Sequence, residues 1–212
     1  MLKISRYELG PIAANCYVLT DEEGKRAVVI DPGAPEGVLT SALDGLTVEA
    51  VLLTHAHFDH IGGVDLMRKT FGCPVWLHPS EKDWLTDPRL NGSARWPDVT
   101  PPISVDPPER ELNDGDTLEL IGETFRVLHI PGHSPGSVGF LCGNVLFGGD
   151  VLFRCSVGRT DLPFGDAATL ERSIRDKLYV LPDDVVVFPG HGPATTIGEE
   201  KRENPFVRAA RG

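Results

Sequence analysis

Short apolar, β-branched runs that end at Gly, Pro, His or Asp recur along the chain. A short apolar run bounded by turn residues is typical of a strand that is buried on both faces. We therefore predict strands at 27–30, 48–53, 75–77, 125–129, 138–141, 145–147 and 185–188. Together with the helical stretches described next, they predict a mixed α/β chain.

Stretches with helical periodicity lie between these strands. One follows Pro35, with apolar residues at 38, 39, 42 and 43, and another should run from His60 to Lys69. A third follows Asp166, a residue type that caps helices, and has apolar residues at 170, 174 and 178. Near the C-terminus, Thr196 and Glu199 have the spacing of a capping box, which predicts a last helix toward Arg208.

Residues 79–108 differ from the rest because they have many prolines, little periodicity, and the tryptophans Trp84 and Trp96. Long irregular segments in compact domains are usually functional or disordered, and large aromatic side chains indicate packing against something. We predict a lid that borders a cleft. The alternative is a surface excursion whose tryptophans only cover the core.

Length and charge narrow the class of protein. The chain has 212 residues and a formal net charge of -11, with no long run of Lys or Arg. We expect a single domain over residues 1–212 and no binding of nucleic acid, because a negative protein repels a polyanion. No segment is apolar enough to enter a membrane, so we expect a soluble, cytoplasmic protein. The four cysteines lie far apart, which predicts reduced thiols, and Cys155 is interpreted as structural.

The strongest chemical signal is the run LLTHAHFDH, residues 52–60. In an extended segment, side chains two positions apart point the same way, so His55 and His57 can hold one ion together. Asp59 and His60 begin the next helix and are offset enough to hold a second ion beside the first. Imidazole and carboxylate ligands suit Zn²⁺, Fe²⁺ or Mn²⁺, and the residues alone do not separate these metals.

Three further candidate ligands lie in glycine-rich turns after predicted strands: His133 in PGHSPGSV, Asp150 in LFGGD and His191 in FPGHGP. Glycine permits the tight turns that bring a side chain close to a metal. Other polar residues have simpler explanations. His78 is interpreted as an ordinary strand-end residue and His129 as a hydrogen-bonded residue, whereas Asp31 either supports the ligands or only forms the DPG turn.

The order of H-x-H-x-D-H, PGH, GGD and PGHG along the chain resembles the metallo-β-lactamase superfamily. The segments GGDVLF, VGRTDLPFGD and FPGHGPATTIGEEKRENPF are similar to the small bacterial glyoxalase II type, the hydroxyacylglutathione hydrolases without the helical C-terminal domain. The resemblance implies a four-layer αββα sandwich. It also implies that His55, His57 and His133 bind one metal, that Asp59, His60 and His191 bind the other, and that Asp150 bridges the two.

For function, the resemblance implies hydrolysis of glutathione thioesters such as S-lactoylglutathione by a hydroxide that bridges two divalent metals, zinc first, with iron or manganese as alternatives. Asp59 is the candidate catalytic residue. Arg159 is the candidate contact for glutathione, although it could instead pair with Asp161 or Asp166. The alternatives are a glutathione persulfide dioxygenase with a single Fe²⁺ and a non-catalytic metal-binding redox module. A ligand set without cysteine departs from many antibiotic-hydrolysing enzymes, so β-lactamase activity is not expected.

Overall fold

Two six-stranded sheets form the centre of the molecule in a computed structural model that describes residues 2–208. The first sheet has the order β1-β2-β3-β4-β5-β6, with strands Lys3–Leu9, Ala14–Thr20, Arg26–Ile30, Thr47–Leu52, Val75–Leu77 and Arg110–Glu111. The second has the order β14-β13-β10-β9-β8-β7, with strands, in that order, Thr195–Thr196, Val186–Pro189, Val145–Gly149, Val138–Cys142, Glu123–His129 and Thr117–Leu120. A separate hairpin joins β11 (Leu152–Phe153) to β12 (Ser156–Val157).

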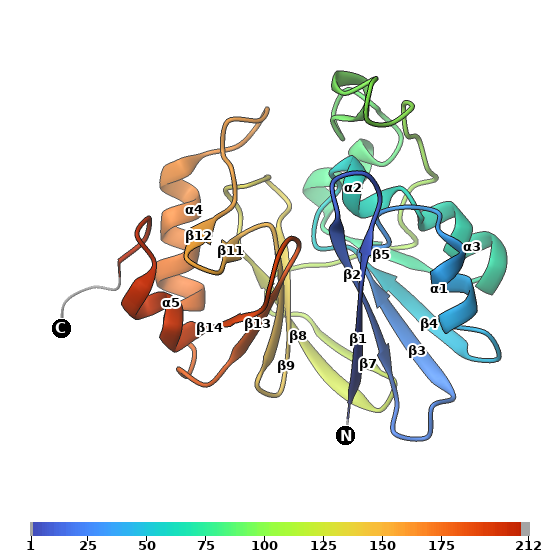
Figure 1. Cartoon of the computed structure of the whole chain (residues 1–212), viewed down its shortest axis with the longest axis horizontal. Helices are drawn as coiled ribbons and strands as arrows, with labels where there is room; N and C mark the ends of the chain where they lie inside the picture. Colours follow the sequence, from blue (N-terminus) through green and yellow to red (C-terminus); the bar gives the residue numbers. More distant parts are fainter. Residues whose placement is uncertain (1, 209–212) are drawn as a thin grey trace.

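Helices cover the outer face of each sheet (Figure 1). On the first sheet these are α1 (Gly37–Ala42) and α3 (Val64–Phe71), and on the second α4 (Ala167–Ser173), the π-helical turn η3 (Ile174–Leu178) and α5 (Ile197–Glu203). The layers are therefore helix, sheet, sheet, helix, and the predicted αββα sandwich is confirmed. Within the described residues no helix has the length and apolarity needed to cross a membrane.

The alternation of side chains along the strands builds the layers. In β3, Val28 and Ile30 lie in the cluster between the two sheets, whereas Ala27 and Val29 lie in the cluster beneath α1 and α3. Successive side chains of a strand point to opposite faces, so a strand that is covered on both faces needs apolar residues at every position. This explains why the central strands appeared in the sequence as continuous apolar runs.

Several predicted element bounds needed correction, and the strand predicted at 48–53 is β4 at Thr47–Leu52. The helix expected from His60 to Lys69 is two helices, α2 (Phe58–Ile61) and α3, divided at Gly62 and Gly63. A Cβ on Gly62 would lie 2.4 Å from the carbonyl oxygen of Gly33, and one on Gly63 would lie 2.6 Å from that of Ala34, so the break lets two main chains approach closely. The last strand is shifted by one residue, to β13 at Val186–Pro189.

The C-terminal helix is also shorter than the prediction toward Arg208, because α5 ends at Glu203. The next residue, Asn204, accepts hydrogen bonds from the main-chain N–H groups of Phe206 and Val207, which turns the chain away from the helix axis. The sequence prediction missed β1 and β2 completely. The single-domain prediction reaches residues outside the described range and stays a prediction.

Candidate metal centre

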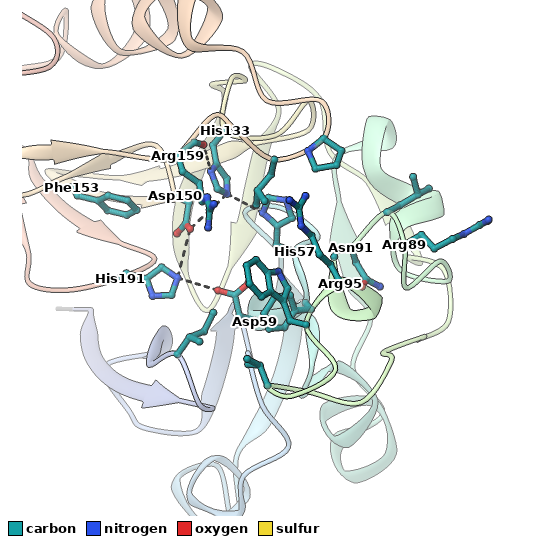
Figure 2. Close-up of a pocket in the computed structure, with 18 of the residues that line it drawn as sticks. His57, Asp59, Arg89, Asn91, Arg95, His133, Asp150, Phe153, Arg159 and His191 are labelled. Carbon is teal, nitrogen blue, oxygen red and sulfur yellow. Dashed lines mark hydrogen bonds and ion pairs between the residues drawn. The ribbon is translucent and has the colours of Figure 1, made fainter.

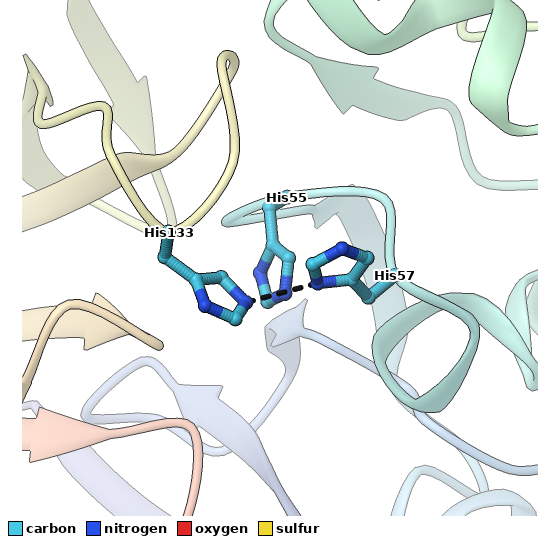
Figure 3. Close-up of side chains that lie close together, drawn as sticks. All are labelled: His55, His57 and His133. Carbon is cyan, nitrogen blue, oxygen red and sulfur yellow. Dashed lines mark hydrogen bonds between the residues drawn. The ribbon is translucent and has the colours of Figure 1, made fainter. Parts of the chain in front are cut away.

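Three histidines from two loops form a first group of candidate ligands. His55 and His57 follow β4, and His133 lies in the loop between β8 and β9. One ligand atom from each lies within 4.8 Å of the others, and Nδ1 of His57 is 2.9 Å from Nε2 of His133. The rings point toward one another (Figure 3). A single ion placed among them would contact histidine nitrogen atoms from loops that follow strands of both sheets.

Asp59, His60 and His191 form a second group, again with one ligand atom from each within 4.8 Å of the others. Asp59 and His60 lie in α2, and His191 follows β13. Nε2 of His191 lies 3.0 Å from Oδ2 of Asp59, and Nε2 of His60 lies 3.4 Å from the same oxygen. The two groups are adjacent, because the His60 ring lies 4.2 Å from the His55 ring between centroids, and His55 and His60 also form a possible ligand group with Asp31.

Asp150 lies between the two groups (Figure 2). Its Oδ2 is 3.6 Å from Nε2 of both His133 and His191, and its Oδ1 is 3.5 Å from Nε2 of His60. The Asp150 side chain can occupy this place because residue 190 is a glycine. A Cβ on Gly190 would lie 2.1 Å from Oδ1 of Asp150. The structure thus brings together in one place all the ligands that the sequence predicted.

The electrostatics of the cluster suit a cation. Burial, and then the neighbouring histidines, lower the pKa of His55 well below its ordinary value and that of His57 to about 3, so both rings are neutral, and a neutral imidazole has a nitrogen lone pair that can bind a metal. For His60, burial acts in the same direction, but the carboxylates of Asp59 and Asp150 outweigh it and raise the pKa. The second group therefore attracts positive charge.

Unpaired buried atoms provide a direct test of whether metal ions fit. Among the described residues, four buried side-chain atoms have no hydrogen-bond partner. One is Oδ1 of Asn15, and the other three are Nε2 of His55, Nε2 of His60 and Oδ1 of Asp150. A buried polar atom without a partner costs about 1–3 kcal/mol, and native proteins contain few of them. All three atoms belong to the cluster and are metal-ligand types. A metal would satisfy them, so the residues present fit the metal centre that the family resemblance implies.

Asp31 contacts the candidate ligand His60 and the neighbouring Thr54 and helps to orient the ligand cluster. Its Oδ2 accepts a hydrogen bond from Oγ1 of Thr54 at 2.6 Å and lies 3.0 Å from Nδ1 of His60. Oγ1 of Thr54 in turn lies 3.0 Å from Nδ1 of His55, and Nδ1 of His133 lies 2.8 Å from the carbonyl oxygen of Arg159. Such contacts fix the orientation of a histidine ring and the nitrogen it presents to a metal. Of the two interpretations of Asp31, the supporting role is observed.

Glu81 is a supporting residue that the sequence analysis missed. Its side chain is completely buried, and burial raises its pKa. Oε2 accepts from the N–H of Ala56, between His55 and His57, and Oε1 accepts from the N–H of Gly136, with both bonds at 2.6 Å. One carboxylate thus joins the two loops that provide the first ligand group. Nothing in the local sequence HPSEKDW marks this glutamate.

A cleft of about 530 Å³ opens above the cluster. Its floor includes His57, Asp59, His133, Asp150 and His191, and its walls come from the β1–β2 turn, the β11–β12 hairpin and residues 89–99. Trp96 lines the cleft, and the Trp84 ring packs on His57 with 5.6 Å between centroids. The prediction that the segment from Trp84 to Trp96 borders the cleft is confirmed.

The remaining predicted residues have clear positions. Arg159 lines the cleft, but its guanidinium also pairs with Asp161 through two contacts of 2.7 Å, so the pairing proposed as an alternative is present. His78 and His129 stack on each other with 4.2 Å between ring centroids, and neither belongs to a ligand group among the described residues. Cys155 is an exposed free thiol whose main-chain N–H donates to the buried carboxylate of Glu200.

Comparison with known proteins identifies the family. The model of the metallo-β-lactamase superfamily matches residues 9–191. Hydroxyacylglutathione hydrolase GloC of Haemophilus influenzae is 41% identical over 210 residues, which cover 95% of this chain and 98% of GloC.

Two crystal structures extend the comparison. The BLEG-1 B3 metallo-β-lactamase is 48% identical, with a TM-score of 0.90 and coverage of 98% of this chain and 99% of that one. TTHA1623 in a di-iron-bound form is 42% identical, with a TM-score of 0.84, and the match covers 96% of this chain and 100% of TTHA1623. Because the family model spans most of the chain and these relatives match along nearly their whole length, the chain belongs to the metallo-β-lactamase superfamily.

Proposed function

We propose that this protein is a metal-dependent hydrolase of glutathione thioesters such as S-lactoylglutathione. The observation that carries the proposal is the paired cluster of ligands, with Asp150 between its two halves, on the floor of an open cleft. The choice of thioester is supported by similarity to hydroxyacylglutathione hydrolase GloC. Because hydroxide is the attacking group in this reaction, no serine or cysteine side chain is needed as a nucleophile.

The residues divide into roles as follows. His55, His57 and His133 would hold one divalent ion, Asp59, His60 and His191 the other, and Asp150 would contact both. Zinc is the expected metal, with iron as the main alternative because a related structure holds two irons, and manganese as a further one. Ions bound there would lower the pKa of a shared water toward neutrality, supply hydroxide at pH 7 and polarise the substrate carbonyl.

Asp59 is the proposed catalytic side chain. Thioester hydrolysis forms a C–O bond to the attacking hydroxide, breaks the C–S bond and leaves a thiolate that takes up a proton. Asp59 lines the cleft beside the cluster, so its carboxylate is within reach of the reacting groups and can accept and pass on this proton. Trp96 lines one side of the cleft, and the Trp84 ring packs on His57.

Arg159 is a proposed contact for the thiol half of the substrate. Its pair with Asp161 uses Nε and Nη2 and leaves Nη1 for a substrate carboxylate. The pair reduces the net charge that a substrate meets at this wall, so we expect Arg159 to contribute less than a free guanidinium would.

A second candidate activity is hydrolysis of β-lactams, which a specific observation favours: the 48% identity to the BLEG-1 B3 metallo-β-lactamase. The same hydroxide that attacks a thioester carbonyl can attack a strained amide. The persulfide dioxygenase alternative requires a single iron and molecular oxygen, and the complete second ligand group argues against it.

One set of measurements tests these functions together. Metal content is measured after anaerobic purification, and the protein is assayed with S-lactoylglutathione without oxygen, with a chromogenic cephalosporin, and with glutathione persulfide in an oxygen electrode. We expect two metals per chain and anaerobic thioester hydrolysis that exceeds cephalosporin hydrolysis. One iron per chain, with oxygen consumption and no anaerobic turnover, would show that the hydrolase proposal is wrong.

A further inference from the structure

Three arginines line the cleft, namely Arg89, Arg95 and Arg159, and they differ in how far other side chains neutralise them. Arg89 makes two contacts with Asp87, at 3.1 and 2.7 Å, and Arg159 makes two with Asp161, both at 2.7 Å. Among residues 2–208, no carboxylate lies within ion-pairing distance of Arg95, and its guanidinium carbon lies 5.9 Å from the Trp96 ring. The carboxylate of Asp161, which pairs with Arg159, attracts Arg95 only at longer range. Arg95 is therefore the cleft arginine that forms no ion pair of its own within the described residues.

The main chain that carries Arg95 is fixed to the metal centre. Phe58, between His57 and Asp59, donates its N–H to the carbonyl oxygen of Asn91 at 3.0 Å. The buried Asn91 amide donates to the carbonyl oxygens of Trp84 and Ile103, both at 2.9 Å. These bonds hold the lid turn η2 (Ser93–Arg95) at a set distance from the ligand run.

Ser93 adds a further constraint. It is completely buried, its N–H donates to Oδ1 of Asn91, and its Oγ accepts from the N–H of Ile103 at 2.8 Å. The N–H of Arg95 donates to the carbonyl oxygen of Gly92 at 3.0 Å. The backbone around Arg95 is therefore held in place before a ligand binds, which lowers the entropy lost when its guanidinium contacts a ligand.

The charges around the cleft select the class of ligand. The carboxylates on its described lining are those of Asp59 and Asp150, and both belong to the ligand cluster, where bound cations would neutralise them. The chain as a whole carries a net charge of -11 and repels anions elsewhere. An anionic ligand is therefore drawn to this cleft, and Arg95 is the unpaired positive charge at its wall.

We propose that Arg95 is the residue through which the cleft recognises a carboxylate on the thiol half of its substrate, ahead of Arg159. The inference rests on the proposed thioesterase function and deepens it. A guanidinium presents a fork of N–H donors that fits a carboxylate, and a free guanidinium does not first have to give up another partner.

The test compares S-lactoylglutathione with its dimethyl ester, in which two methyl esters replace the two negatively charged carboxylates. Arg95→Gln should raise KM for the acid about tenfold, with little change in kcat, because a charge-assisted contact at an exposed site contributes about 1.4 kcal/mol, equivalent to tenfold. KM for the ester should stay within about twofold, because no charge contact is lost. Arg95→Lys should restore most of the affinity for the acid.

Two further variants provide the comparison. Arg159→Gln should raise KM for the acid less than Arg95→Gln does. Arg175→Gln is the matched control, because Arg175 pairs with Glu171 and does not line the cleft, and it should leave both substrates unchanged. Equal losses for acid and ester in Arg95→Gln, or a larger loss in Arg159→Gln, would overturn the proposal.

The inference and the proposed function can fail separately. If the wild type hydrolyses thioesters but Arg95→Gln shows no charge-dependent effect, the function stands and the role of Arg95 is wrong. If no thioester is hydrolysed, the proposed function fails, and calorimetric binding of S-hexylglutathione, which has no thioester to cleave, tests Arg95 instead. About tenfold weaker binding in Arg95→Gln would support its role, whereas an unchanged Kd, or no binding to the wild type, would refute it.

Discussion

Replacing the buried Glu81 by glutamine should destabilise the protein although the side-chain shape is kept. Two main-chain N–H groups, of Ala56 and Gly136, each donate to a different carboxylate oxygen. Glutamine has one acceptor oxygen and one NH₂ group, so one of these donors would face another donor. Because both N–H groups lie in loops packed around a fully buried side chain, water cannot easily replace the lost acceptor.

The magnitude follows from the bonds that are lost. One hydrogen bond to a charged acceptor contributes about 1.5–3 kcal/mol, and the remaining bond becomes neutral and weaker. Removing the buried charge also removes its desolvation cost, which offsets part of this loss. We therefore expect Glu81→Gln to lower the free energy of unfolding by about 2–3 kcal/mol, and Glu81→Met, which removes both acceptors, by about 3–5 kcal/mol.

Urea unfolding of the metal-free proteins at pH 7 measures these losses through the midpoint at constant slope. Glu203→Gln is the matched control, because Glu203 is exposed at the end of α5, and its effect should stay within about 0.5 kcal/mol. Competition with a chelator then measures metal affinity, which should fall in Glu81→Gln because the loops bearing the first three histidines are no longer joined. If Glu81→Gln and Glu203→Gln unfold at the same urea concentration, the carboxylate does not have the structural role described for it.

Four further predictions follow from the site. His191→Ala should lower the metal content toward one ion per chain by removing a ligand of the second group, measured by elemental analysis, and retention of two ions would contradict the division of ligands. Asp59→Ala should depress kcat by at least about a hundredfold in steady-state assays of S-lactoylglutathione, with a smaller change in KM. Gly190→Ala should weaken metal binding, seen by chelator competition, because its Cβ would meet Oδ1 of Asp150. Trp96→Ala should raise KM with unchanged metal content, because Trp96 lines the cleft and lies outside the ligand cluster.

The sequence by itself determined the parts of this protein that depend on neighbouring residues. Strands covered on both faces must be apolar at consecutive positions, so β3 and β4 were visible in the hydrophobic pattern. The relative directions of the three histidines and Asp59 could be predicted from the sequence, because an extended segment followed by a helix fixes which side chains share a direction. The helix caps Asp166 and Thr196 could also be predicted from neighbouring residues. Each side chain accepts a hydrogen bond from the main-chain N–H group three residues later.

Only the tertiary structure decided the contacts between residues that lie far apart in the chain. Strand β1 was missed because polar residues interrupt its apolar pattern, and the buried strand β2, with which it pairs, was overlooked although it contains the apolar run 16–19. The bridging position of Asp150 and the link that Glu81 makes between the two ligand loops depend on how two sheets pack against each other. Likewise, only the spatial neighbours of Arg159 and Arg95 show that the first forms an ion pair with Asp161 and that the second lines the cleft without an ion pair of its own. Such differences lie in packing and electrostatics over long sequence separations, which local residue patterns do not encode.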